Sequence, residues 1–440
     1  MDPRTASPGQ SIWRDTPEDT FRKHLVDLEE RTNAVPVEAH YDVSDERDEK
    51  EANCLEGSHL LHRSLEQRLA DDFAFLAAVE EGAQSVAAAC LEEGREPYSL
   101  TVRFAAVDAI KEPLCTALQH ACKILTDSAR ETASTHTDRL FYHVIQLHYR
   151  RILARLRSIK WKKPTYLSKS HKKPLWQDFP NLIHRVQFLY TKQEKGARKL
   201  VEGQLQRLGM SYEMFEVIEA GSDAEFTHLV QMIHTSFSLC TSEPIRTYSR
   251  RLQAVSVTSQ VASAVKSLRQ IEKIAAYWRV PLSLTRASGS YPNLFHRVNL
   301  EFLPPYSSIT TSIGYESWAK TCHVHAEVQL VVYYDLHPQI FGQNKLRPRM
   351  IGSSKYLCYL CHLFVKAHGH FPAMNTHGRL YDQWTIPDLA DYDDLQRQKY
   401  RAVVQSIDQE IIGLATKPLL WRPEPMTSRQ HLLDPVDQYF

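Results

Sequence analysis

The sequence predicts an α/β protein in which a mostly α-helical domain precedes an α/β/α layer sandwich with a mixed sheet at the C-terminal end. Apolar residues recur at helical spacing from about Leu60 to Val280, as at Val261, Val265 and Leu268. After Pro281, short apolar runs alternate with turn residues. The elements predicted there follow the order strand, helix, strand, helix, strand, strand, helix, which is typical of layered α/β domains.

Each element after Pro281 has its own signal. Apolar runs bounded by turn residues predict strands, and apolar residues three or four apart predict helices. His337-Pro338 ends the first helix, since proline stops helices, and His377-Gly378 is expected to join two strands in a hairpin. Residues 298–302 and 307–313 together predict the first strand and a turn, the later predicted strands are 349–353, 371–375 and 380–386, and the predicted helices are 322–336, 357–367 and 391–415.

Four regions are expected along the 440 residues. Residues 1–57 are acidic, interrupted by prolines and poor in apolar periodicity, so we predict that they are disordered or loosely attached. A helical domain is expected over 58–285, the α/β domain over 286–420, and a C-terminal tail over 421–440.

Composition favours an intracellular, non-membrane protein. The formal net charge is +1, so no overall field attracts nucleic acid or membrane. Neither a bilayer-spanning run nor the apolar core of a secretory signal is evident. The eight cysteines are scattered apart from the last pair, which predicts reduced thiols. We therefore expect a cytoplasmic or nuclear location and no membrane partner.

The most specific motif combines His325-Ala326-Glu327 with Cys358-Tyr359-Leu360-Cys361. One imidazole and two thiolates can hold Zn²⁺ and leave its fourth position open, which is the arrangement of catalytic zinc sites. Cys358 and Cys361 are spaced to share one face at the start of a helix. His325 and Glu327 are about 200° apart on a helix, so they can converge only at its first turn.

An open zinc site of this kind suits hydrolytic deamination. Zinc lowers the pKa of its bound water to about 7, so hydroxide is available at neutral pH. Glu327 is then predicted to act as general acid/base, moving the proton of that water to a ring nitrogen and then to departing ammonia. The alternative is a closed structural site, in which a neighbour supplies the fourth ligand. The neighbours that could do so are Cys322, His323 and His362.

A basic segment between Arg150 and Lys173 contains no acidic residue and has Trp161 and Tyr166 among its cations. Cations with interleaved aromatic rings suit a phosphate backbone and stacked bases. The alternatives are a solvated helix face with a basic loop, or a nuclear-import signal. The predicted contact residues are Arg150, Arg151, Arg155, Arg157, Lys160, Lys162 and Lys163, and Lys169, Lys172 and Lys173 complete the segment.

Over residues 290–420 the sequence resembles the OTT-like branch of the cytidine-deaminase-like superfamily. The run from Gly352 to Cys361 matches its Gly-x-Ser-Lys-x-x-Cys-x-x-Cys pattern, and His377-Gly378-x-x-Tyr381-x-x-Trp384-x-x-Pro387 matches a later one. The chain lacks the proline that precedes the first of these cysteines elsewhere in the superfamily.

The resemblance implies a cytidine-deaminase-like fold, a zinc cofactor and a nucleobase substrate in nucleic acid or a nucleotide. It implies zinc ligands His325, Cys358 and Cys361 and the proton shuttle Glu327. Aromatic rings near this site are candidates for stacking on a base. The residues predicted to bind substrate are Lys355, Tyr356 and Trp384.

The leading functional prediction is a zinc-dependent deaminase that acts on a base in single-stranded nucleic acid, by attack of zinc-bound hydroxide. Its helical domain is expected to recruit the substrate or a protein partner. One alternative is a non-catalytic, zinc-stabilised scaffold or binding protein. The other is a deaminase of free nucleotides or nucleosides, for which the basic segment would be incidental.

Overall fold

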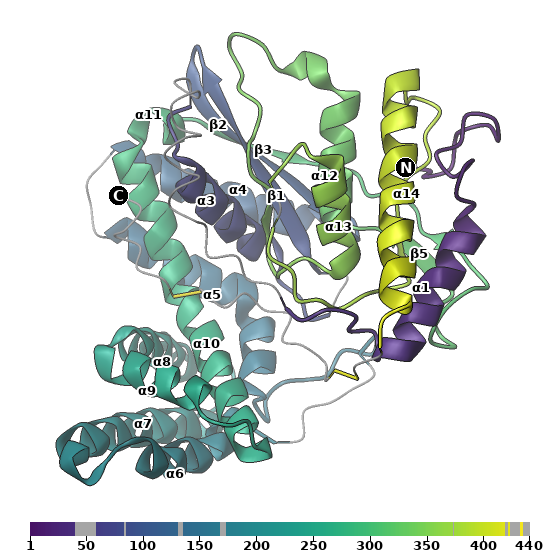
Figure 1. The fold of residues 1–440 in the computed structure, drawn as a ribbon. Helices are drawn as coiled ribbons and strands as arrows, with labels where there is room; N and C mark the ends of the chain where they lie inside the picture. Colours follow the sequence, from purple (N-terminus) through teal and green to yellow (C-terminus); the bar gives the residue numbers. More distant parts are fainter. Residues whose placement is uncertain are drawn as a thin grey trace. The chain divides into compact units, whose positions relative to one another are not determined.

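The computed structural model describes residues 1–39, 59–82, 85–130, 135–167, 173–372, 374–418, 421–422 and 432–433. The chain divides into two compact units, and every strand among the described residues belongs to the first (Figure 1). The first unit takes its residues from 1–78, 83–122 and 291–429, and the second from 79–82, 123–290 and 430–440. Helices with residues in the first unit are α1 (Glu18–Thr32), α3 (Arg63–Ala77), α4 (Glu112–Arg130, in part), α11 (Pro292–Phe295), α12 (Ala326–Leu336), α13 (Tyr359–His368) and α14 (Asp394–Ala415).

A four-stranded mixed sheet is the main sheet of the first unit. Its strands are β1 (Ala87–Arg95), β2 (Tyr98–Ala106), β3 (Val298–Phe302) and β6 (Gly352–Ser353), in the order β3-β2-β1-β6. Strand β1 pairs antiparallel with β2 and β6, and β2 pairs parallel with β3. The sheet therefore joins an early hairpin to strands from the last third of the chain.

Helices cover both faces of this sheet. Ala89 lies opposite Phe104, whose ring contacts Phe73 of α3. The neighbouring pair, Ala88 and Ala105, lies in the hydrophobic core that contains α12 and α13. Because successive residues of a strand point to opposite faces, α3 covers one face and α12 the other.

The hairpin of β1 and β2 corrects the prediction of a helical domain over 58–285. The run Ala87–Ala89 favours a helix by intrinsic propensity. The burial of both faces removes the alternation of apolar and polar residues that identifies a half-exposed strand. Pairing with β3 and β6, far along the chain, makes these residues strands.

A second sheet has three strands, of which β5 (Thr321–Val324) leads into α12. The order of this sheet is β4 (Ile309–Thr310), β5 and β7 (Trp384–Thr385), and β5 pairs parallel with β7. Two predictions are corrected here. The helix predicted from residue 322 begins only after His325, because β5 occupies the preceding residues. The predicted hairpin of 371–375 with 380–386 does not form among the described residues, since β7 pairs with β5 instead.

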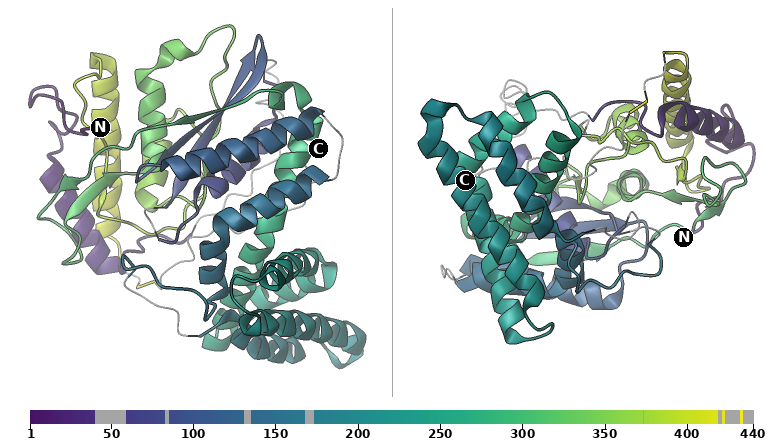
Figure 2. Two further views of the ribbon diagram at one scale, coloured as in Figure 1. Left: turned by 180° about the vertical axis from the view of Figure 1, so that it is seen from behind. Right: turned by 90° about the horizontal axis from the view of Figure 1, so that it is seen from below.

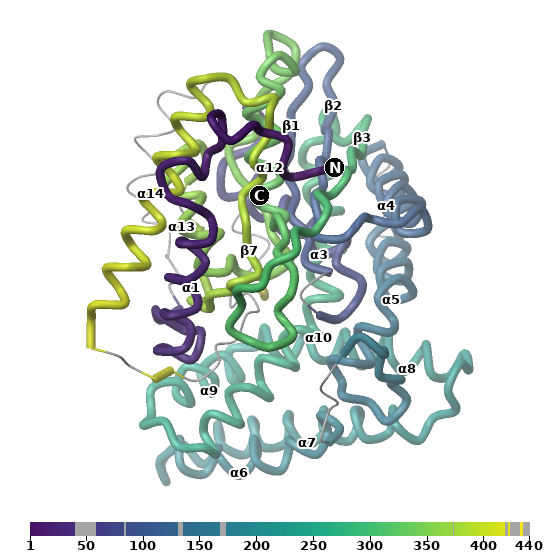
Figure 3. Tube along the Cα trace, turned by 90° about the vertical axis from the view of Figure 1, so that its right-hand side faces the viewer, coloured from purple at the N-terminus to yellow at the C-terminus, as the bar shows by residue number. Residues whose placement is uncertain are grey.

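Residues 1–39 belong to the first unit, so the prediction of disorder is wrong for them. Helix α1 lies along α14 (Figure 3), and its apolar side joins the core of α12 and α13. A helix of this length gains stability from the apolar face it buries, and the rest of the fold supplies that contact. Residues 40–57 of the predicted disordered segment lie outside the described residues. The buried apolar residues of α1 are Phe21, Leu25 and Leu28.

The second unit is helical, and its helices are drawn mostly in teal in Figure 2. Helix α10 packs against α5 and α8, and α6 packs against α7. Pro281 lies inside α10, so the change of pattern after it does not mark a helix end. Among the described residues, no helix combines the length and apolarity needed to cross a bilayer. The helices are α5 (Thr135–Leu156), α6 (Phe179–Leu189), α7 (Lys195–Val217), α8 (Asp223–Thr241), α9 (Glu243–Ala254) and α10 (Ser259–Ser290).

Candidate functional site

His325 lies at the junction between β5 and α12. Its backbone is extended, with φ −68° and ψ 156°, and it caps the amino end of the helix. Glu327 lies in the first turn of α12. Both side chains therefore start at the helix end, which is where their two-residue spacing allows them to converge.

The two cysteines lie at the start of α13. Cys358 caps this helix with φ −67° and ψ 163°, and its Sγ accepts a hydrogen bond from the backbone N–H of Cys361 at 3.3 Å. Unpaired N–H groups and the helix dipole place positive potential at this end and favour a thiolate. As the spacing predicts, both sulfurs lie in the first turn of one helix.

The two helix starts bring one nitrogen and two sulfurs together. The Nδ1 of His325 lies 3.6 Å from the Sγ of Cys358 and 3.4 Å from the Sγ of Cys361. Zn–N and Zn–S bonds of ordinary length would separate a nitrogen and a sulfur by about 3.5 Å in a tetrahedral site. The three donors therefore fit a small tetrahedral cation, and they form a group that could hold a metal ion.

None of the three neighbours considered as a fourth ligand joins this group among the described residues. The Sγ of Cys322 faces the backbone oxygen of Asp382 at 4.0 Å. A ring nitrogen of His323 lies 3.1 Å from Thr321 Oγ1, and one of His362 lies 2.7 Å from the Met374 carbonyl oxygen. The fourth position of a tetrahedral ion is therefore left to a ligand from outside these neighbours.

The two thiols differ in their tendency to ionise. Burial opposes ionisation of Cys358, but hydrogen bonding with Cys361 and the positive charge of His325 outweigh it and hold the pKa of Cys358 well below its usual range. Burial and the neighbouring Cys358 raise the pKa of Cys361 well above the usual range. The pair thus carries one thiolate readily, and a divalent cation would favour the second.

Glu327 is placed beside the donors rather than among them. Its side chain is buried, and its Oε2 lies 3.4 Å from the Sγ of Cys361. Burial raises the pKa of Glu327, and the positive charge of His325 opposes this shift. A carboxyl group with a raised pKa next to an open coordination position is suited to accept and return a proton.

The run before Cys358 is fixed by close contact with α3. A Cβ added to Gly352 would lie 2.0 Å from the backbone carbon of Ala70, so only glycine lets the helix approach this strand. The backbone N–H of Ser353 donates to Asp71 Oδ1 at 2.8 Å. These contacts set the direction in which β6 leads to Cys358.

Two residues whose roles were not predicted, His377 and Tyr381, lie near the donors. The ring centroid of Tyr381 is 6.4 Å from that of His325 and 6.0 Å from that of His377. Burial lowers the pKa of His377 to about 4, so this histidine is neutral. His377 was expected in the connection of a hairpin, and it is buried. The His-Gly-x-x-Tyr spacing was the signal that could have identified both residues.

The three predicted substrate-binding residues have different surroundings. Lys355 is half-buried, and its positive charge helps to lower the pKa of His377. Tyr356 is 9% exposed. Trp384 is fully buried, and its ring contacts Phe21 and Phe364 in the core. The structure thus places Trp384 among core side chains and does not bring it to a surface where a base could stack.

The basic segment does not form one exposed surface. Lys160 pairs with Glu225 at 2.7 Å, and Arg157 pairs with Asp178. Arg151 is buried, and the guanidinium of Arg155 lies over a tyrosine ring. Of the seven predicted contact residues, three are exposed, and Lys169 and Lys172 lie outside the described residues. The exposed three are Arg150, Lys162 and Lys163.

Comparison with known proteins agrees with the geometry of the donors. Residues 324–388 match the family model described as an OTT_1508-like deaminase. No curated protein and no solved structure matches the chain. The matched segment includes His325, Glu327, Cys358 and Cys361, the residues that the structure brings together. Residues 324–388 are therefore a partial match to the OTT-like deaminase family, the family that the motifs resemble.

Proposed function

We propose that this protein is a zinc-dependent hydrolytic deaminase that acts on a nucleobase in single-stranded nucleic acid. One observation carries the proposal. His325, Cys358 and Cys361 supply three donors at tetrahedral spacing, no neighbour among the described residues supplies a fourth, and the buried carboxyl of Glu327 lies beside them. This arrangement suits an open hydrolytic site better than a closed structural one.

The reaction exchanges an exocyclic amino group for oxygen. Water forms a C–O bond at the ring carbon that bears the amino group, the C–N bond breaks, and ammonia leaves as the base becomes a carbonyl compound. Zinc held by His325, Cys358 and Cys361 would lower the pKa of water at this site. Glu327 Oε2 passes one proton of the water to the ring nitrogen of the base and the second to the leaving amino nitrogen.

The residues around the donors have supporting roles. Neutral His377 and the ring of Tyr381 form one side of the site, and they offer a hydrogen-bonding nitrogen and an aromatic edge to a planar base. Lys355 adds a half-buried cation whose charge helps to lower the pKa of His377, and a cation there suits a phosphate attached to that base. A base within a strand must be unstacked to enter, at about a few kcal/mol.

A deaminase of free nucleotides or nucleosides is the second candidate, and one observation favours it. The ion pairs of Arg157 and Lys160 remove charge from the basic segment that was expected to hold a polynucleotide. A free nucleotide requires no such surface, since a single phosphate site is enough.

The test combines metal content with ammonia release. Wild type and Glu327→Gln are assayed with cytosine- and adenine-containing single strands, nucleotides and nucleosides. We expect one zinc per chain in both proteins and ammonia from wild type alone, with single strands as the better substrates. Ammonia only from monomeric substrates would favour the second candidate. Zinc without ammonia from any substrate would favour a non-catalytic scaffold, and absence of zinc would contradict the metal site.

A further inference from the structure

A pocket of the second unit lies where α6 and α9 end and α10 begins. Its volume is about 480 Å³, within the roughly 300–1,000 Å³ that is usual for ligand pockets. Leu252 and Val261 are buried in its lining, whereas Phe188 and Val255 are exposed there. The pocket is therefore a mostly apolar depression that is open to solvent.

Apolar side chains are exposed around this pocket. Phe188 and Val255 line it, and the exposed Val257 lies between Ser256 and Thr258, which also line it. The side chain of Phe188 is 64% exposed, so most of its ring is available for contact. Single exposed apolar residues need no explanation, but a group of them around a depression is typical of a binding site.

The lining contains one cation, the guanidinium of Arg185, which lies 4.8 Å from the centroid of the Phe188 ring. No acidic residue in the described part of the chain lies within ion-pair distance of Arg185, and its buried Nε has no hydrogen-bond partner. Arg251 differs, since it pairs with Glu194 at 2.6 Å and donates to the Leu189 carbonyl oxygen at 2.9 Å. The pocket thus contains a positive charge that these residues leave uncompensated.

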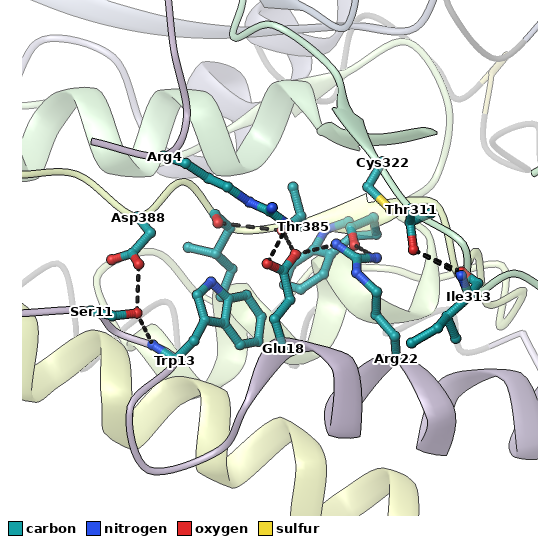
Figure 4. Close-up of polar contacts among 12 residues, drawn as sticks. Arg4, Ser11, Trp13, Glu18, Arg22, Thr311, Ile313, Cys322, Thr385 and Asp388 are labelled. Atoms are coloured by element: carbon teal, nitrogen blue, oxygen red, sulfur yellow. Dashed lines mark hydrogen bonds and ion pairs between the residues drawn. The ribbon is translucent and has the colours of Figure 1, made fainter. Parts of the chain in front are cut away.

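Two buried arginines of the first unit show how the fold compensates such a charge. Arg22 of α1 faces the carboxylate of Glu18, as Figure 4 shows, and donates to the Asp382 carbonyl oxygen at 3.2 Å. Arg103 of β2 pairs with Glu92 at 2.6 Å. The half-buried Arg185 has no such partner among the described residues, so a carboxylate from a ligand would supply one.

The segment between α9 and α10 offers backbone donors beside the same pocket. Val255 is extended, with φ −88° and ψ 159°, and Ser256 follows it in the lining. Over the described ranges, no residue accepts a hydrogen bond from the backbone N–H of Ser256 or Val257. Extended backbone with unpaired N–H groups can pair with a peptide that is added as a strand.

We propose that this pocket binds an extended peptide segment of a protein partner, in which an apolar residue lies next to an acidic one. The apolar side chain packs against Phe188, and the carboxylate pairs with Arg185. The peptide backbone accepts from the N–H groups of Ser256 and Val257. A fatty acid would leave these N–H groups unpaired, which favours the peptide. The inference concerns the second unit and does not depend on the deaminase proposal.

The experiment selects peptides from a displayed library of random sequences on the full-length protein. We expect the enriched peptides to place an apolar residue beside an acidic one. Arg185→Gln should weaken their binding by about 10-fold, the loss expected for a charged hydrogen bond, as measured by fluorescence anisotropy. Arg207→Gln, at an exposed arginine of α7, is the matched control and should bind as wild type does.

A second pair of variants tests the backbone contact. Ser256→Pro removes the N–H, and proline tolerates the extended conformation of the preceding Val255. Ser256→Ala removes only the hydroxyl group. We expect Ser256→Pro to weaken peptide binding by roughly 2–10-fold and Ser256→Ala to leave it unchanged. Circular dichroism verifies that each variant is folded.

Folded wild-type protein that enriches no peptide would overturn the inference. Enriched peptides that bind wild type and Arg185→Gln equally would overturn it as well. If laurate binds wild type but not Arg185→Gln and no peptide is enriched, the pocket belongs to a fatty acid instead. If Arg185→Gln abolishes self-association of the chain and no peptide is enriched, it belongs to a second copy. Ammonia release enters none of these measurements, so the deaminase proposal can fail separately.

Discussion

The metal-donor group of the first unit and the basic segment of the second differ in where the partners of their side chains come from. The donors face one another across two helix starts, so the group points inward to a common centre. The cations of the basic segment turn to separate acids, as Lys160 does to Glu225 of α8 and Arg157 to Asp178. A motif whose spacing fits a helix start keeps its side chains together in the fold, whereas the cations of a basic run can form ion pairs with separate acidic residues.

Loss of one donor is expected to have the largest effect. Mutation of a residue that hydrogen-bonds to a metal ligand typically weakens metal binding by roughly 10–100-fold, and Cys361→Ser, which changes a ligand itself, should weaken zinc binding by more. The matched control is Cys322→Ser. Cys322 is also buried, and it was one of the three neighbours considered as a fourth ligand. Metal content after dialysis against a chelator distinguishes the two variants. Zinc lost by both variants would favour the closed structural site, and zinc retained by Cys361→Ser would contradict the donor group.

The buried pair of Lys160 and Glu225 is expected to matter for stability. Both side chains are less than a tenth exposed, and Glu225 also accepts hydrogen bonds from Tyr149 and Gly221. Lys160→Met leaves the carboxylate without its cation and should destabilise the second unit by about 3–5 kcal/mol. The exposed Lys162→Met should change stability by less than about 0.5 kcal/mol. Equal denaturant midpoints for the two variants would show that the pair contributes little.

Glu29 of α1 is a second buried carboxyl group, and its pKa is raised. Burial and the nearby Asp382 raise the pKa of Glu29 to about 9. The folded protein therefore keeps this proton up to about pH 9, whereas the unfolded chain releases it above its ordinary pKa of 4.5. The contribution to stability is complete below pH 4.5 and is lost as the pH rises toward 9.

Glu29→Gln should remove this part of the pH dependence, so the variant should gain stability relative to wild type between pH 5 and about pH 9. Thermal unfolding at several pH values across that range measures the difference. Glu30→Gln is the control, since Glu30 is the exposed neighbour on the same helix. Parallel pH profiles for wild type and Glu29→Gln would contradict the raised pKa.

The smallest effect on stability is expected for the exposed part of the basic segment. Lys162→Ala with Lys163→Ala should leave unfolding unchanged, but it should lower the salt dependence of single-strand binding by up to about 0.7 per lost phosphate contact. Lys195→Ala with Lys199→Ala, on exposed positions of α7, makes the same change of charge elsewhere. Identical salt slopes for both double variants would favour the free-nucleotide candidate.

Local sequence signals were sufficient for the elements that carry the donors. The helix predicted at 357–367 is α13 at Tyr359–His368, and the one predicted at 391–415 is α14 at Asp394–Ala415. The motif spacing also predicted that His325 and Cys358 would lie at helix starts. Helix capping and i, i+3 spacing depend on neighbouring residues, so a short stretch of sequence contains the information.

The sequence by itself therefore determined the chemistry that this protein can offer: an imidazole, two thiols and a carboxyl group at two helix starts. Only the tertiary structure decided that Ala87–Ala106 is a strand hairpin, that α1 belongs to the core, and that Trp384 is buried there. The exposure of the basic segment likewise depends on acidic residues that are distant in the sequence. The physical reason is that strand pairing, burial and ion pairing depend on partners far along the chain, and no local pattern specifies which partner will be present.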